Sequence, residues 1–123
     1  MIRSLSLSAV LLALAASPAA AAKAGQSRLE LSYTAAAGYA GAVELRCKPA
    51  AGPHPQKAAA CKALTAAKGD PAKLKPRAGM CTMQYDPVTA TIQGTWRGGQ
   101  VAWSKTFGNA CAMRQAMGAV MAF

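Results

Sequence analysis

The sequence predicts an α+β fold in which a five-stranded antiparallel sheet carries two helices on one face and is crosslinked by two disulfides. Two pairs of segments alternate apolar and polar residues across short glycine-containing turns, a pattern typical of β-hairpins. Two other segments are rich in alanine and further helix-forming residues. The chain also contains four cysteines behind an export signal, which favours disulfide bonds.

The N-terminal residues have the composition of a secretory signal peptide. Arg3 provides the positive charge, the apolar run LSLSAVLLALAA follows it, and SPAAAA offers small residues for cleavage. The apolar run is too short for a spanning helix, and we expect no membrane as a partner. The alternative interpretation is a buried N-terminal helix. We therefore divide the chain into a signal peptide, residues 1–22, and one secreted, extracellular domain, residues 23–123.

The first half of the domain is predicted as a hairpin followed by a helix. Residues 28–35 and 42–47 alternate on either side of the turn GYAG and form the first hairpin. A loop with three prolines, KPAAGPHPQ, precedes the helix KAAACKALTAAKG, where Gly69 takes the C-terminal capping position. The next segment, DPAKLKPRAGM, is predicted as a loop with a short helical turn after Pro71.

The second half is predicted as another hairpin and another helix. Residues 88–96 and 100–107 alternate across the turn RGG and form a hairpin whose strands are exposed on one side. The helix NACAMRQAMGAV begins at Asn109, whose side chain suits the N-cap position. The last residues, VMAF, are predicted as the fifth strand.

The cysteines indicate disulfides rather than a metal site. Cys47, Cys61, Cys81 and Cys111 allow three pairings, and sequence reasoning leaves the choice among them open. No C-x-x-C motif is present, so we expect no metal. The single histidine, His54, lies in the proline-rich loop and is interpreted as a solvated residue.

The chain is strongly basic, with 14 Lys and Arg residues against four Asp and Glu residues and a net charge of +10. The basic residues are dispersed, and KLKPR, residues 73–77, is their one cluster. Because no aromatic residue is interleaved with this cluster, we expect no nucleic-acid partner and interpret the charge as a solvated surface. One histidine and four acidic residues do not equip the chain for acid–base catalysis, so we predict no enzymatic activity and no cofactor.

The segment CTMQYDP, residues 81–87, places Met83 between polar neighbours and two residues after a cysteine. Methionine commonly fills gaps in cores, which is one interpretation of Met83. In the other interpretation, a disulfide at Cys81 and the restriction imposed by Pro87 hold the segment extended, exposed and rigid. A protease active site accepts extended segments, and a rigid one loses little entropy on binding. Such a segment is a substrate that binds tightly and turns over slowly.

The block MCTMQYDPV, together with GTW, FGNAC and the final AF, resembles the Streptomyces subtilisin inhibitor family. The resemblance runs from about residue 29 to the C-terminus. It implies a five-stranded antiparallel sheet with two helices, a homodimer assembled through the sheet, and the disulfides Cys47–Cys61 and Cys81–Cys111. We also expect a sheet face with exposed apolar side chains, which would favour the homodimer.

The resemblance assigns a protease-binding loop made of Met80, Cys81, Thr82, Met83, Gln84 and Tyr85. Met83 matches the family's primary specificity residue, and Met83–Gln84 matches its reactive bond. Met80 matches a residue that fills a second apolar subsite, and Asn109 matches an asparagine that supports the loop by hydrogen bonding. Thr82 stands where proline is common in the family, and Gln84 where an aliphatic residue is familiar.

The resemblance therefore implies a secreted inhibitor of subtilisin-like serine proteases, with chymotrypsin-like proteases as further targets. It would bind the protease active site in the manner of a substrate. The alternative is a secreted, disulfide-bonded basic module with the same fold and an anionic or cell-surface partner.

Overall fold

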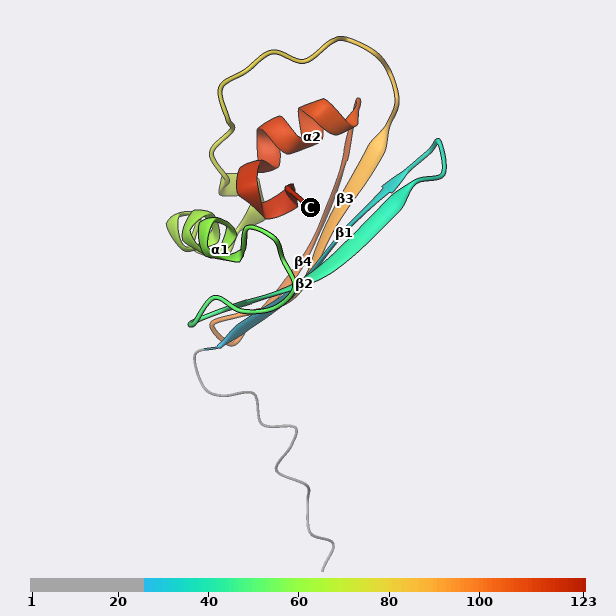
Figure 1. The fold of residues 1–123 in the computed structure, drawn as a ribbon. Coiled ribbons are helices and arrows are strands. Elements are labelled where there is room, and N and C mark those ends of the chain that lie inside the picture. The colour runs from blue at the N-terminus through green and yellow to red at the C-terminus, as the bar shows by residue number, and fades with distance from the viewer. Residues whose placement is uncertain (1–25) are drawn as a thin grey trace, which may run out of the picture.

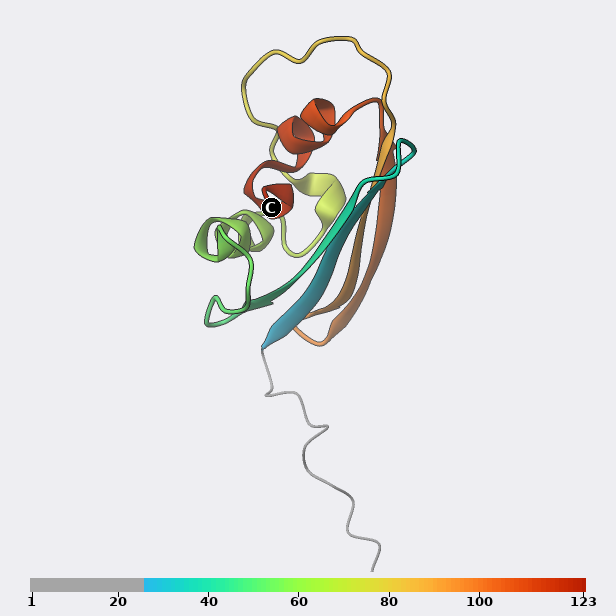
Figure 2. The same ribbon diagram turned by 45° about the vertical axis from the view of Figure 1, so that its right-hand side comes forward.

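The computed structural model describes residues 26–123, in which helices cover one face of a β-sheet (Figure 1). Figure 2 shows the same two layers from a second direction. The segment predicted as a signal peptide lies outside the described residues. The elements in chain order are β1 (Ser27–Ala35), β2 (Ala40–Cys47), α1 (Lys57–Ala66), the 3₁₀ helix η2 (Pro71–Lys73), β3 (Val88–Trp96), β4 (Gly99–Phe107), α2 (Ala110–Met117) and the 3₁₀ helix η3 (Gly118–Met121).

The sheet has four antiparallel strands in the order β2-β1-β3-β4. β1 and β2 form the first predicted hairpin, with Leu31 opposite Val43, and β3 and β4 form the second, with Ile92 opposite Trp103. The two hairpins join where β1 pairs with β3, with Leu31 opposite Ile92. This pairing confirms both hairpins that were predicted from the alternating pattern. The register places the apolar side chains of both hairpins on one face of the sheet.

The prediction of a fifth strand is wrong, and with it the five-stranded sheet. Of the residues expected to form this strand, Val120 and Met121 lie in η3, which packs against α1, and Ala122 and Phe123 follow η3 without forming a strand. All four residues of η3 are buried, whereas a half-buried strand would expose every second side chain. A short continuous apolar run is compatible with either structure, so its period could not distinguish them. The α+β class and the two helices of the prediction remain.

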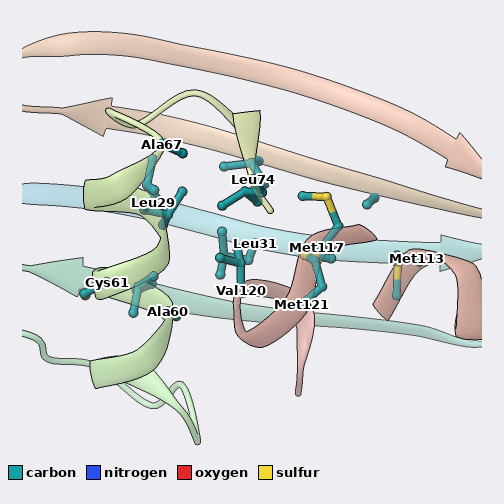
Figure 3. Packing of buried hydrophobic residues seen from close by; sticks show 14 of the residues in the cluster. Leu29, Leu31, Ala60, Cys61, Ala67, Leu74, Met113, Met117, Val120 and Met121 are labelled. Atoms are coloured by element: carbon teal, nitrogen blue, oxygen red, sulfur yellow. The ribbon is translucent and has the colours of Figure 1, made fainter. Parts of the chain in front are cut away.

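The hydrophobic core fills the space between the sheet and the helices (Figure 3). Its fully buried large side chains include Leu29, Leu31, Leu45, Leu64, Val88, Ile92, Met113, Val120 and Met121. Burial of each such side chain contributes about 1.5–3 kcal/mol. The core therefore holds α1, α2 and η3 against the sheet. Within residues 26–123, no helix is long and apolar enough to span a membrane.

Two disulfides crosslink the sheet and the helices. Cys47 at the end of β2 is bonded to Cys61 in α1, and Cys81 is bonded to Cys111 in α2. The pairing implied by the resemblance is thus confirmed. The second bond matters most for the site, because it attaches the segment before β3 to the first turn of α2.

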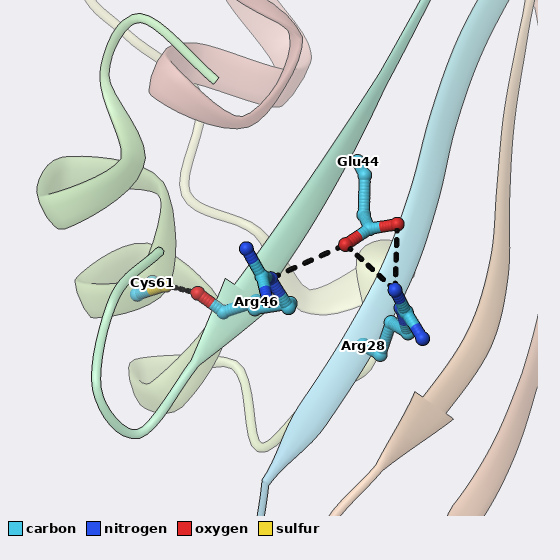
Figure 4. Close-up of polar contacts among 4 residues, drawn as sticks. All are labelled: Arg28, Glu44, Arg46 and Cys61. Carbon is cyan, nitrogen blue, oxygen red and sulfur yellow. Dashed lines mark hydrogen bonds and ion pairs between the residues drawn. The ribbon is translucent and has the colours of Figure 1, made fainter. Parts of the chain in front are cut away.

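Ion pairs stabilise one end of the outer sheet face, opposite the helices (Figure 4). Arg28 of β1 lies 3.2 Å from the Glu44 carboxylate of β2, and Arg46 Nε lies 3.2 Å from the same carboxylate. The Cys61 Sγ atom lies 3.3 Å from the Arg46 carbonyl oxygen. This contact is not a hydrogen bond, because the oxidised sulfur carries no proton.

The rest of the outer face is also polar. The Thr89 and Thr106 hydroxyl groups are hydrogen-bonded at 2.8 Å, and those of Thr91 and Ser104 at 3.3 Å. Among the described residues, the large hydrophobic side chains that are exposed all lie outside the strands: Tyr39, Met80, Met83 and Tyr85. The exposed apolar side chains expected on a sheet face are therefore limited to alanines such as Ala42 and Ala102.

His54 is buried, which corrects its interpretation as a solvated loop residue. Its side chain is 2% exposed and packs edge-on against the Phe123 ring. The Gln56 N–H donates to Nδ1 at 2.9 Å, so Nδ1 is unprotonated and Nε2 donates to the Val120 carbonyl oxygen at 2.9 Å. His54 thus connects the proline-rich loop to η3.

Candidate functional site

The segment between η2 and β3, residues 74–87, forms an arch above α2 at one end of the molecule (Figure 1). Met80 and Met83 are 99% and 97% exposed, and Tyr85 is 82% exposed. The core-packing interpretation of Met83 is therefore wrong. Thr82 and Gln84 are exposed as well, so the arch presents a continuous row of accessible side chains.

Asn109 caps α2 and binds the arch with the same side chain. Its Oδ1 accepts a hydrogen bond from the Ala112 N–H at 2.8 Å, which confirms the predicted N-cap. Its Nδ2 donates to the carbonyl oxygens of Thr82, at 3.0 Å, and Gln84, at 2.8 Å. These two carbonyls flank Met83, so one amide group fixes the backbone on both of its sides.

Gln115 is a second amide side chain of α2 that binds the arch, and sequence reasoning missed it. Its Nε2 donates to the Gly79 carbonyl oxygen, immediately before Met80. The main-chain carbonyl oxygen of Gln115 accepts the Arg77 N–H at 2.7 Å. Gln115 follows Cys111 by four residues, which places both side chains on one face of the helix. This spacing was the one sequence signal that could have identified Gln115 as a contact of the arch.

The C-terminal end of the arch is held by backbone hydrogen bonds. The Asp86 N–H donates to the Gly108 carbonyl oxygen at 2.8 Å, at the end of β4. The Pro87 carbonyl oxygen accepts the Ala36 N–H at 3.0 Å, in the turn between β1 and β2. The arch is therefore fixed at both ends and, through Asn109, at its centre.

A hollow of about 390 Å³ separates the arch from α2, and Met83, Asn109 and Gln115 are among the residues that line it. The exposed part of the arch, residues 75–85, thus stands clear of the core and depends on a small number of named attachments. Among residues 26–123, no three His, Cys, Asp or Glu side chains are grouped so that they could hold a metal ion. What the site offers is an exposed peptide segment with fixed carbonyl positions.

These features define a class of protein, a disulfide-bonded α+β scaffold that presents a peptide segment to a partner. Residues 25–109 of the chain match the family described as Subtilisin inhibitor-like. The chain belongs to this family, which confirms the resemblance seen in the sequence. Because the family consists of protease inhibitors, the prediction that the chain is not an enzyme is also confirmed.

Named relatives agree in sequence. Subtilisin inhibitor-like protein 1 of Streptomyces cacaoi is 44% identical over 87 residues, which cover 67% of this chain and 78% of that protein. A subtilase-type protease inhibitor of Streptomyces coelicolor is 43% identical over 84 residues, covering 67% of this chain and 58% of its own length. The chain therefore matches more than half, but not all, of the length of these relatives.

A solved structure agrees in fold. It is the crystal structure of Streptomyces caespitosus sermetstatin in complex with Bacillus licheniformis subtilisin. The superposition has a TM-score of 0.66 and 34% sequence identity, and it covers 80% of this chain and 100% of that chain.

Proposed function

We propose that this protein inhibits subtilisin-like serine proteases by inserting the part of the arch from Met80 to Tyr85 into the protease active site. The observation that carries the proposal is Met83, which is 97% exposed between two carbonyls that Asn109 holds in place. Family membership and the relatives named as protease inhibitors support the same partner. The exposed position of Met83 suits a residue that enters the primary specificity pocket.

The geometry supports slow turnover of the bond between Met83 and Gln84. The protease serine would attack the Met83 carbonyl carbon and release the Gln84 amine, leaving Met83 as an acyl group on the enzyme. The disulfide between Cys81 and Cys111 retains one side of the cleaved bond, and β3 retains the other. The Gln84 amine would therefore stay close to the acyl carbon and could re-form the peptide bond.

The side chains of the arch set the proposed specificity. Met83 is unbranched and apolar, which suits the apolar primary pocket of subtilisin-like enzymes and, less well, that of chymotrypsin-like enzymes. Met80, also fully accessible, would fill a second apolar subsite. Thr82 and Gln84 would contact the subsites on either side of the Met83 pocket.

Titration of subtilisin activity tests the proposal, with an expected end point of one protease per chain. Met83→Gly should weaken inhibition roughly ten- to a hundredfold, because burial of a methionine side chain contributes about 1.5–3 kcal/mol. Met83→Lys should instead gain inhibition of trypsin, whose pocket contains a carboxylate. If both variants inhibit subtilisin as well as the wild type does, Met83 is not the specificity residue.

We further propose that residues 1–22 are removed on secretion and that the domain, residues 23–123, acts outside the cell. The signal-like composition and the two disulfides support this localisation. The intact mass of the exported protein should correspond to cleavage near residue 22. A mass that retains the N-terminal segment would contradict the assignment.

The homodimer is a proposal that rests on family resemblance alone, because the outer sheet face carries threonine, serine and paired charges. A dimer through this face would bury mostly polar groups, which contribute little net free energy even when they are hydrogen-bonded. Light scattering at micromolar concentration should give the mass of two chains. A single-chain mass would refute the homodimer.

A further inference from the structure

We propose that Arg77 and Arg114 form an interaction surface, the basic flank, for an acidic rim on the target protease. The inference rests on the proposed function and names the kind of protease that this inhibitor fits. The rim would lie beyond the subsite that receives Met80, on the side of the protease that binds residues preceding the scissile bond. The flank would select among subtilisin-like proteases by the charge of that rim.

The flank is built from two segments that the fold brings together next to the arch. Arg77 lies in the arch three residues before Met80, and its backbone N–H donates to the main-chain carbonyl oxygen of Gln115 in α2 at 2.7 Å. Arg114 is the neighbour of Gln115 in the last turn of α2. Both arginines line one hollow of about 270 Å³, together with Met80 and the Cys81–Cys111 disulfide. A protease that accepts Met80 therefore approaches both arginine residues.

The charges of the flank are available to a partner. Arg77 and Arg114 are both exposed. The ion pairs of the described residues join Glu44 to Arg28 and Arg46, on the outer sheet face and away from the arch.

The acidic residues of the chain all lie elsewhere. Glu30 and Glu44 are on the outer sheet face, Asp70 caps η2, and Asp86 follows the reactive bond. The approach to Met80 is therefore positively charged without a compensating carboxylate in the flank. This location also accounts for KLKPR, the one basic cluster of the sequence, since its last residue belongs to the flank.

Complementary charge at the edge of an interface acts mainly on the association rate and its salt dependence. For unit charges roughly 10 Å apart in water, Coulomb's law gives about a fourfold change in rate for each reversed charge and roughly fifteenfold for two. The effect should be present at about 0.01 M salt, where the screening length is roughly 30 Å. It should vanish at about 1 M salt, where that length is roughly 3 Å.

The experiment uses two forms of Bacillus licheniformis subtilisin that differ at two rim positions beside the subsite for Met80, carrying Glu in one form and Lys in the other. The inhibitor variant is the double reversal Arg77→Glu with Arg114→Glu. Its matched control, Lys57→Glu with Lys62→Glu, changes the net charge equally on α1, which lies away from the top of the arch in both views (Figure 1; Figure 2). Association rates are measured at low and high salt.

The wild type and the control should associate faster with the Glu form, and the flank variant should prefer the Lys form, with all preferences lost at high salt. Equal rates for both forms, or an equal loss in the control, would overturn the proposal. Arg114→Gln alone, an exposed helix substitution, gives a smaller change in the same direction and covers the case in which the double variant misfolds. If the flank variant loses retention on heparin but keeps its protease rates, an anionic polymer is the partner and the proposal is wrong. If the wild type fails to inhibit either form at high salt, the proposed function itself fails.

Discussion

Asn109→Asp separates the two roles that Asn109 combines. The Asp carboxylate can still accept the Ala112 N–H that Asn109 Oδ1 accepts at 2.8 Å, and Asp is as good an N-cap as Asn. It cannot donate to the carbonyl oxygens of Thr82 and Gln84, which Nδ2 reaches at 3.0 and 2.8 Å. The substitution therefore preserves the helix cap and removes both attachments at the centre of the arch.

The expected magnitude follows from those two hydrogen bonds. Each contributes about 0.5–1.5 kcal/mol net. Their loss should therefore raise the free energy of holding the arch in its binding conformation by about 1–3 kcal/mol. This corresponds to inhibition weakened roughly five- to 150-fold, with faster cleavage between Met83 and Gln84. The midpoint of thermal unfolding should change little. Asn109→Ala, which removes the cap as well, should also lose about 0.5–2 kcal/mol of stability.

Two measurements decide the matter, the inhibition constant against subtilisin and the amount of chain cleaved during prolonged incubation with equimolar protease. Unchanged inhibition and cleavage in Asn109→Asp would show that the hydrogen bonds to Thr82 and Gln84 do not position the arch. A parallel loss of thermal stability in Asp and Ala variants would show that the effect passes through the helix instead.

Three further substitutions test other attachments. Gln115→Ala should weaken subtilisin inhibition about two- to tenfold, because the hydrogen bond to the Gly79 carbonyl oxygen is lost. The control, Gln93→Ala on the outer sheet face, should leave inhibition unchanged. Equal effects of the two substitutions would contradict the role of Gln115 in holding the arch. Gly69→Ala should lower the midpoint of thermal unfolding by several degrees. Gly69 has φ of 76°, and an added Cβ would clash with the Trp96 ring. An unchanged midpoint would refute this. His54→Phe keeps an aromatic ring beside Phe123 but leaves the Val120 carbonyl oxygen without its donor. The free energy of unfolding, measured by chemical denaturation, should therefore fall by about 1–3 kcal/mol. An unchanged value would mean that a water molecule replaces the imidazole donor.

Sequence patterns predicted those elements whose side chains alternate between core and solvent. β3 spans the residues expected from VTATIQGTW, because Val88, Ala90 and Ile92 are buried and their neighbours are not. The C-terminal segment carried no such information, since every residue of η3 is buried. Its conformation is decided by packing against α1, and no local period records that packing.

Sequence patterns predicted the parts of the candidate site that depend on neighbouring residues. They missed the side chains whose contacts are distant in the sequence. Asn109 was readable as an N-cap, and the family resemblance identified the arch. Gln115 bonds a carbonyl 36 positions away, and His54 bonds one 66 positions away. A proline-rich neighbourhood suggested solvent exposure for His54, but the tertiary fold placed η3 and Phe123 over it.

The attachments at the N-terminal side and at the centre of the arch depend on the core through a single short helix. Cys111 and Gln115, four residues apart on one face of α2, both attach the arch, as Asn109 does from the N-cap. Met113 and Met117, on the opposite face, are 1% and 3% exposed and anchor the same helix in the core. Because interiors are close-packed, a change of volume at either methionine moves the helix as a unit rather than being absorbed locally. The rigidity that the proposed inhibition requires therefore depends on Met113 and Met117, which lie on the face of α2 opposite the arch, one helix diameter (roughly 10 Å) away from it.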